Sequence, residues 1–223
     1  MGVKRMISRR KAIKLGLAST ALGVVGATKI THSWGREMLM PTPAEVEGPF
    51  YPITDQHDKD ADLTLIAGHK KHANGQPIII EGTVTDINGM PVNHAVIELW
   101  QANASGKYNH PRDPNPAPLD PDFQGWAVIN SDRNGFYSFK TVKPGAYPAT
   151  KTWIRPPHIH FKISGNNCRI LTTQLYFPDE PLNEADLLLR NKSLKEQSAM
   201  IAKFVGKYED MIKFSYNIVL MPG

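Results

Sequence analysis

Two histidines separated by one residue carry the clearest chemical signal in this sequence. They lie in segment 155–161, which reads Arg-Pro-Pro-His-Ile-His-Phe. Alternate residues of a β-strand point to the same face, so His158 and His160 would share one face of such a strand. Two imidazoles about 6 to 7 Å apart on one strand can bind a single metal ion. The alternative is a pair of surface histidines on a solvent-exposed face.

A metal ion bound there needs further ligands from other segments. The single cysteine, Cys168, excludes a thiolate cluster. One candidate is a site of two histidines and one carboxylate, with Glu98 or Asp132 as the acid. The other is ligation by Tyr108 and Tyr147, because two phenolates and one hydroxide would balance the three positive charges of Fe(III). The remaining histidines are predicted to be solvated: His32, His57, His69, His72, His94 and His110.

Tyr147 also has a structural interpretation. It ends the run Pro-Gly-Ala-Tyr, which near a strand end is typical of a corner tyrosine whose hydroxyl binds nearby backbone. The stretch 82–147 resembles carboxypeptidase-regulatory-like and transthyretin-like modules, which are not enzymes. A non-catalytic binding module is therefore an alternative function for the chain.

The elements that must position these side chains are predicted to be mainly strands. The chain has 17 glycines and 18 prolines, which favour short strands and many turns. Segment 183–207 lacks proline and has apolar residues at helical spacing, so it predicts a helix. We expect a mainly β fold, an immunoglobulin-like or transthyretin-like sandwich with a C-terminal helical excursion, and an ordered Pro-rich loop over 109–124. The predicted strands are 78–85, 92–101, 126–129, 136–139, 158–163, 171–177 and 216–220.

Several segments in fixed order resemble the intradiol ring-cleavage dioxygenases, which include the protocatechuate 3,4- and catechol 1,2-dioxygenases. The similarity begins at Glu47 and ends near Phe177. Because only about 15 to 20 residues separate the N-terminal leader from Glu47, the layout is closer to a protocatechuate-type subunit. The most specific segments are 98–108, 120–125, 144–148, 155–161 and 172–177.

The resemblance implies a set of site residues. Arg155, Gln174 and Tyr147 would serve catalysis, because a guanidinium can stabilise negative charge on a substrate ring and an amide can hydrogen-bond an oxygen. The implied ligands of a non-haem Fe(III), with hydroxide as the fifth, are Tyr108, Tyr147, His158 and His160. The implied substrate contacts are Gly48, Pro49, Tyr51, Arg155 and Gln174.

The activity implied by the resemblance is cleavage of an aromatic diol by O₂. Both oxygen atoms would enter between the two hydroxylated carbons and give a cis,cis-muconate-type diacid, with Tyr147 leaving the metal as the substrate binds. Ala149 and Thr150 stand where protocatechuate-type subunits often have Trp, so catechol, protocatechuate and hydroxyquinol all remain candidate substrates. A related fold that uses zinc for hydrolysis is a second alternative. The sequence leaves open whether the chain forms a homo-oligomer.

The positive charge of the chain is concentrated at its N-terminus. Residues 1–30 contain seven basic residues and no acid, whereas residues 31–223 contain 19 basic and 21 acidic residues, a net charge of −2. This body is a poor match for a nucleic-acid partner. Arg9 and Arg10 precede an apolar run over 15–27, which is too short to span a membrane and resembles a twin-arginine export signal. We expect a leader over 1–33, a single catalytic domain over 34–223, and export to the periplasm.

Overall fold

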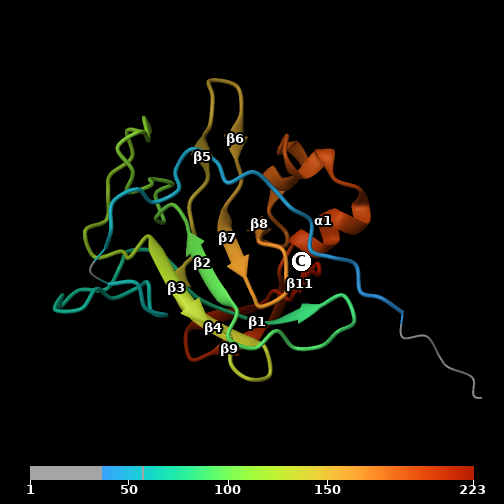
Figure 1. Ribbon diagram of the computed structural model, residues 1–223. Coiled ribbons are helices and arrows are strands. Elements are labelled where there is room, and N and C mark those ends of the chain that lie inside the picture. Colours follow the sequence, from blue (N-terminus) through green and yellow to red (C-terminus); the bar gives the residue numbers. More distant parts are fainter. Residues whose placement is uncertain (1–36, 57) are drawn as a thin grey trace, which may run out of the picture. The chain divides into compact units, whose positions relative to one another are not determined.

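Strands dominate the computed structural model, which describes residues 37–56 and 58–223 (Figure 1). The predicted leader 1–33 and the histidines at 32 and 57 lie outside the described residues. The strands are β1 (Pro77–Asp86), β2 (Val96–Trp100), β3 (Trp126–Asn130), β4 (Phe136–Val142), β5 (Tyr147–Pro148), β6 (Ile154–Arg155), β7 (His158–Ser164), β8 (Leu171–Tyr176), β9 (Lys203–Tyr208), β10 (Met211–Ser215) and β11 (Ile218–Leu220). Three short helices follow β8: the 3₁₀ helices η1 (Pro181–Ala185) and η2 (Leu189–Asn191), and α1 (Leu194–Met200).

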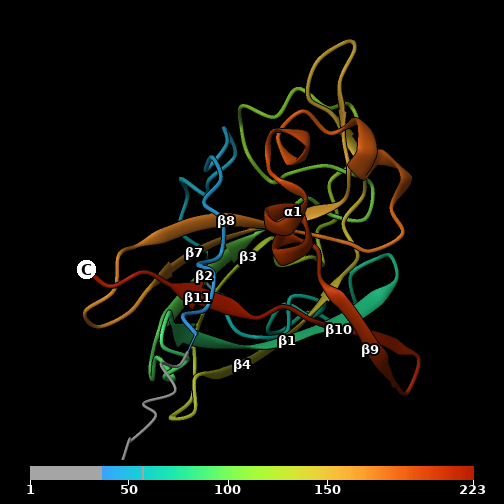
Figure 2. The ribbon, with the colours of Figure 1, turned by 90° about the vertical axis from the view of Figure 1, so that its right-hand side faces the viewer.

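The two main sheets pack face to face, as the sequence predicts for a sandwich. One has the order β11-β1-β10-β9, with β4 also paired to β1, and the other has the order β3-β2-β7-β8. Figure 2 shows the two sheets as separate layers. Ile80 and Phe139 from one layer and Leu99 and Phe161 from the other belong to one buried apolar cluster. The described residues lie in a compact unit over 36–223.

Strand β7 is the element that carries the candidate site. It pairs with β2 on one side and β8 on the other, so Trp100 and Gln174 both lie in register with His160. Ile159 and Phe161 point into the core, which leaves the two histidines on the opposite face as predicted. That face is also covered, because His158 and His160 are each only 2% exposed. The alternative of surface histidines is therefore wrong.

The prediction of one helix over 183–207 is wrong beyond Met200, and the part before it is divided among three short helices. Only η1, η2 and α1 are helical, and Lys203–Tyr208 forms β9, which pairs antiparallel with β10. Phe204, Val205 and Tyr208 are aromatic or β-branched, and pairing with β10 gives their backbone the partners that a strand requires. Ser193 and Glu196 form a capping box that starts α1. The last strand also begins later than predicted, at Ile218.

Two short strands missed by the sequence analysis support Tyr147 and Arg155. β5 and β6 form a two-stranded hairpin in which these two residues are directly paired. The hairpin projects beyond both main sheets (Figure 1). Within the described residues, no helix is long and apolar enough to cross a membrane.

Candidate metal centre and active site

The four predicted metal ligands converge in the structure. The Tyr108 hydroxyl lies 3.1 Å from Nε2 of His160 and 3.4 Å from Nε2 of His158, and these two nitrogens are 3.2 Å apart. The Tyr147 ring packs edge-on against Tyr108 at 5.4 Å between centroids. All four side chains are at most 5% exposed. The fold therefore brings together donors from the loop after β2, from β5 and from β7.

The two imidazoles are held in the form that binds a metal. Nδ1 of His158 donates to the carbonyl of Pro156 at 2.7 Å, so its Nε2 carries the lone pair that faces the other donors. Burial, with a smaller contribution from the positive charge of Arg155, lowers the pKa of His158 well below its usual range. The same causes lower the pKa of His160 to about 3. Both rings are therefore neutral at physiological pH.

The two phenols complete a donor set that suits a trivalent cation. Burial raises the pKa of Tyr108 well above its usual value and also raises the pKa of Tyr147. In Tyr147 the rise is opposed by the charge of Arg155 and by hydrogen bonds with Tyr108 and Arg155. A buried phenolate requires a nearby cation, and two phenolates with two neutral nitrogens match a hard ion such as Fe(III). The residues present thus fit this metal.

The carboxylate alternatives are wrong. Within the described residues, no group of three or more His, Cys, Asp and Glu side chains could hold a metal ion. Glu98 accepts a hydrogen bond from the Tyr51 hydroxyl at 2.6 Å, and Asp132 accepts from the backbone of Asn134 and Phe136 at the turn before β4. Both acids are therefore engaged away from the two histidines.

Tyr108 is positioned by an ordered loop. Its backbone N–H donates to the carboxylate of Asp113 at 2.8 Å, and its ring contacts that of Phe50 at 4.8 Å. Lys107 donates to the carbonyls of Asp113 and Asn115. These contacts tie the start of the Pro-rich loop to the ligand, as expected for an ordered cover over 109–124.

Tyr147 does not behave as a corner tyrosine. Within the described residues its hydroxyl makes no hydrogen bond to backbone, and its ring packs against those of Tyr108 and His158, whereas a corner tyrosine binds backbone. The tyrosine that does bind backbone is Tyr137, whose hydroxyl donates to the carbonyl of Tyr216 at 2.6 Å. The structural role is therefore filled by a different residue.

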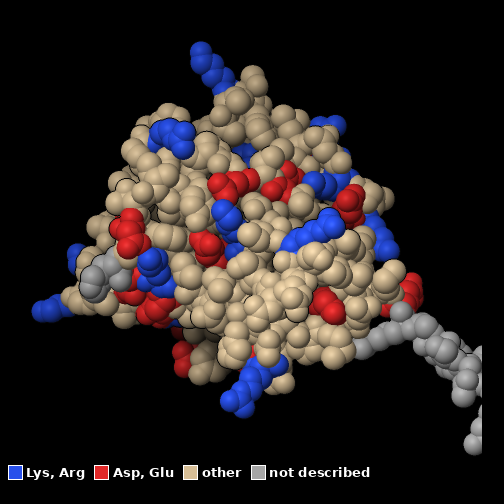
Figure 3. All heavy atoms as spheres, viewed as in Figure 1, with Lys and Arg blue, Asp and Glu red and all other residues tan. Residues whose placement is uncertain are grey.

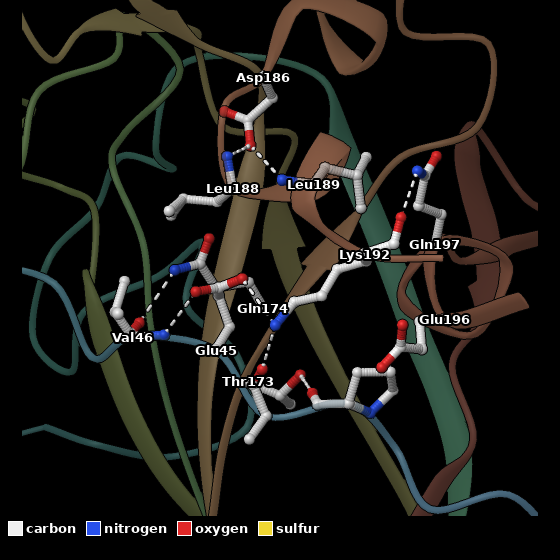
Figure 4. A network of polar contacts seen from close by, with 12 residues as sticks. Glu45, Val46, Thr173, Gln174, Asp186, Leu188, Leu189, Lys192, Glu196 and Gln197 are labelled. Atoms are coloured by element: carbon white, nitrogen blue, oxygen red, sulfur yellow. Dashed lines mark hydrogen bonds and ion pairs between the residues drawn. The ribbon is translucent and has the colours of Figure 1, made fainter. Parts of the chain in front are cut away.

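Arg155 and Gln174 lie together beside the tyrosines. Nη2 of Arg155 donates to Oε1 of Gln174 at 2.7 Å and to the Tyr176 hydroxyl at 2.9 Å, and Nε donates to Asp186 at 2.7 Å. The other end of Gln174 donates to the carbonyl of Val46 at 3.0 Å (Figure 4). The sequence analysis missed both Tyr176 and Asp186. Tyr176 lies within a segment that matches the family, but Asp186 lies in the stretch predicted to be a helix.

The predicted substrate contacts Gly48, Pro49 and Tyr51 lie at different depths. Gly48 has a φ of +78°, and a Cβ there would lie 3.3 Å from Cε1 of His160, so its backbone passes directly beside this imidazole. Pro49 is exposed next to it. Tyr51 is separated from His160 by Trp100, which stacks on the imidazole at 4.8 Å and meets the Tyr51 ring edge-on at 5.0 Å.

The prediction that His110 is solvated is wrong. It is 6% exposed, and its ring lies 5.8 Å from that of Phe50. Phe50 is 60 residues away in the sequence, and such a long-range contact is not revealed by a local sequence pattern. His69, by contrast, is exposed and ion-paired with Asp122.

Comparisons with known proteins match this chain to dioxygenases. A family profile described as Dioxygenase matches residues 46–222. The chain is 39% identical over 160 residues to the protocatechuate 3,4-dioxygenase beta chain of Burkholderia cepacia. This alignment covers 70% of this chain and 68% of the relative. It is 32% identical over 184 residues to catechol 1,2-dioxygenase 1 of Acinetobacter lwoffii, covering 76% of this chain but only 52% of that protein. The chain thus spans about half the length of this second relative.

A solved structure also shares the fold. The dioxygenase domain of a dioxygenase carbohydrate-binding protein fusion from Streptomyces sp. SirexAA-E superposes with a TM-score of 0.62 at 25% identity. The match covers 82% of this chain and all of that one.

Proposed function

This chain belongs to the intradiol ring-cleavage dioxygenase family, and we propose that it cleaves a catechol-type ring between its two hydroxylated carbons. Both atoms of O₂ enter the product, a cis,cis-muconate-type diacid. The observation that carries this function is the convergence of two neutral imidazoles and two phenols, with a buried guanidinium beside them. The chain is accordingly an oxidoreductase that acts on small aromatic diols.

The cofactor we propose is a non-haem Fe(III) held by four side chains. When bound there, it would accept the diol as a dianion and make the ring carbons reactive toward O₂. The support from the structure is the donor chemistry, since the pair of phenols can supply the negative charge that a buried trivalent ion requires. The proposed ligands are Tyr108, Tyr147, His158 and His160.

Tyr147 is the proposed acceptor for one of the two protons that the diol must lose. Burial raises the pKa of its phenol, so its phenolate is basic enough to take a proton from a catechol hydroxyl. It lies on the β5–β6 hairpin outside the main sheets, directly paired with Arg155, whose charge would stabilise the phenolate form before the proton is accepted. Tyr108 is tied to Asp113 through its backbone and is expected to stay in place.

Arg155 is the proposed source of positive charge for the reacting ring. Its guanidinium is 4% exposed and cannot lose its proton, so it stabilises negative charge on the ring without taking part in proton transfer. Both ends of the Gln174 amide are already hydrogen-bonded, one to Arg155 and one to Val46. We therefore assign Gln174 to orienting Arg155, and the second N–H of its amide is the donor proposed for a substrate oxygen.

The experiment is metal analysis and O₂ uptake on the purified protein. We expect stoichiometric iron, a red-brown tyrosinate charge-transfer band and cleavage of an aromatic diol. Side-by-side rates with catechol, protocatechuate and hydroxyquinol identify the preferred substrate. His160→Ala should lose both iron and colour, because His160 supplies one of only two neutral donors. The matched control His69→Ala changes an exposed histidine and should leave both unchanged.

Three results would contradict the proposal. Full iron and colour in His160→Ala would remove His160 from the site. A wild-type protein without metal or colour would favour the non-catalytic transthyretin-like module. A colourless protein containing zinc would favour the hydrolytic alternative.

A further inference from the structure

A fully buried carboxylate forms an ion pair with Arg155. Asp186, which directly follows η1, has no exposed surface, and one of its oxygens accepts from Nε of Arg155 at 2.7 Å. The other oxygen accepts from the backbone N–H groups of Leu189 at 2.9 Å and Leu188 at 3.2 Å (Figure 4). A carboxylate so far from water is stable only when it is paired and hydrogen-bonded. Asp186 meets both conditions.

These contacts fix the orientation of the guanidinium. The two amides at the start of η2 hold one oxygen of Asp186, so its second oxygen points toward Arg155. The guanidinium plane is then set at Nε, while its Nη2 is bound by Gln174 and Tyr176. Arg155 itself lies on β6, in a hairpin outside the main sheets, so its own strand gives its long side chain little support.

The charge of Asp186 matters as much as its geometry. A guanidinium buried without a counter-charge is costly, and it would be free to turn toward other acceptors around it. Pairing with Asp186 supplies that counter-charge at Nε of Arg155.

We propose that Asp186 is a positioning residue that holds Arg155 where negative charge develops on the substrate ring. The proposal rests on the ring-cleavage function proposed above. None of the hydrogen bonds of Asp186 reaches Tyr108, Tyr147, His158 or His160, so its contacts lead to the site through Arg155 and Tyr176.

The test begins with Asp186→Asn in the iron-loaded enzyme. We expect kcat to fall by about 10- to 100-fold, a loss like that seen when the hydrogen-bond partner of a metal-ligating residue is removed. Catechol affinity, measured by absorbance without O₂ so that no turnover occurs, should remain near the wild-type value. A lower kcat with unchanged catechol affinity is expected because negative charge on the ring grows toward the transition state. Glu81→Gln is the matched control: it removes the carboxylate of an ion pair with Lys213 in the other sheet and should leave kcat unchanged.

The decisive comparison is a double-mutant cycle with Arg155→Gln. If Asp186 acts through Arg155, adding Asp186→Asn to Arg155→Gln should cause no further loss of kcat. An equal loss in both backgrounds would overturn the proposal. A purely structural role would lower the melting temperature without this coupling, and that result would also overturn it.

A second variant covers the case in which Asp186→Asn does not fold. Tyr176→Phe removes a hydroxyl that binds Arg155 and lies 3.3 Å from Asp186, while its ring keeps its packing. It should lower kcat without changing catechol affinity, and again without effect in the Arg155→Gln background. Wild-type protein that cleaves no diol would refute the proposed function and this inference with it. Active wild-type enzyme with fully active variants would overturn the positioning role alone.

Discussion

At the scale of single residues, burial is the main cause of the shifted pKa values in the candidate metal centre. It keeps both imidazoles neutral and raises the pKa values of both phenols. His158 is oriented by the carbonyl of Pro156, whereas Nδ1 of His160 has no hydrogen-bond partner among the described residues and its ring is held by stacking on Trp100. The two histidines are therefore neutral for the same reason but are oriented by different contacts.

Replacing Tyr147 with Phe tests the role of this phenol in turnover. Iron should still bind through Tyr108, His158 and His160, and colour should persist because one tyrosinate remains. Ring cleavage should slow by roughly 10²- to 10⁴-fold, the contribution of one positioned proton acceptor. Iron content, the absorption spectrum and kcat measured on the same preparation check this expectation.

Tyr137→Phe is the matched control for this prediction. Tyr137 is also buried, but its hydroxyl donates to backbone far from the four ligands. Its loss should lower the free energy of unfolding by about 1 kcal/mol and leave kcat unchanged. The ligand assignment of Tyr147 fails if Tyr147→Phe behaves like this control.

At the scale of elements, the segment 43–48, which precedes β1, packs along β8 and covers the site. Glu45 donates its backbone N–H to the carbonyl of Thr172, and the Thr173 hydroxyl donates to the carbonyl of Pro43. Together with the bond from Gln174 to Val46, these contacts lay the segment across the edge of the second sheet (Figure 4). The segment then continues to Gly48, beside His160.

Gly48→Ala tests the close approach of this segment to the metal centre. A residue with a Cβ is strained at a φ of +78°, and the new methyl would press on His160. We expect a loss of about 1–2 kcal/mol in stability together with lower kcat and an altered charge-transfer spectrum. Gly68→Ala provides the control, because Gly68 has a φ of +85° but no atom within 4 Å of the position that its new methyl group would take. Equal effects on the spectrum in both variants would show that Gly48 has no special relation to His160.

At the scale of the whole molecule, the buried histidines link folding to pH. Their pKa values lie below the unfolded value of about 6.5, so in mild acid the unfolded chain binds protons that the folded chain does not. Stability of the metal-free protein should therefore fall as pH drops below about 6.5, by at most about 1.4 kcal/mol per pH unit for each histidine. Denaturant unfolding at several pH values measures the slope. His160→Gln should make it shallower, and an unchanged slope would contradict the prediction.

The distribution of basic residues along the chain bears on whether the protein is exported from the cytoplasm. On the face shown in Figure 3, Lys and Arg side chains are interspersed with Asp and Glu and form no continuous basic stripe. The basic residues at the N-terminus remain the distinctive feature, and we propose that they direct export of the folded protein through the twin-arginine route.

Changing Arg9 and Arg10 together to Lys tests this route. The double variant should leave active, iron-loaded enzyme in the cytoplasm, because the signal is read as a pair of arginines. Activity in cytoplasmic and periplasmic fractions measures the outcome, with Arg5→Lys as a control outside the pair. Unchanged export of the double variant would favour the general secretory route.

The sequence by itself determined the features that depend on local periodicity and on matched segments. The shared face of His158 and His160 follows from strand alternation, which needs no knowledge of the partner strands. The family similarity predicted the two tyrosines as ligands, and the structure brings them beside the two histidines. It also placed Arg155 and Gln174 in one pocket, and the structure brings the two together at 2.7 Å.

Only the tertiary structure decided which side chains surround that set. Glu98 and Asp132 could be dismissed once their hydrogen bonds were known, and Asp186 became visible only when its distant partner Arg155 was placed beside it. The helix predicted beyond α1 failed for the same reason, since β10 supplies the pairing that makes β9 a strand. Burial and pairing depend on contacts between segments far apart in the chain, and no local pattern records those contacts.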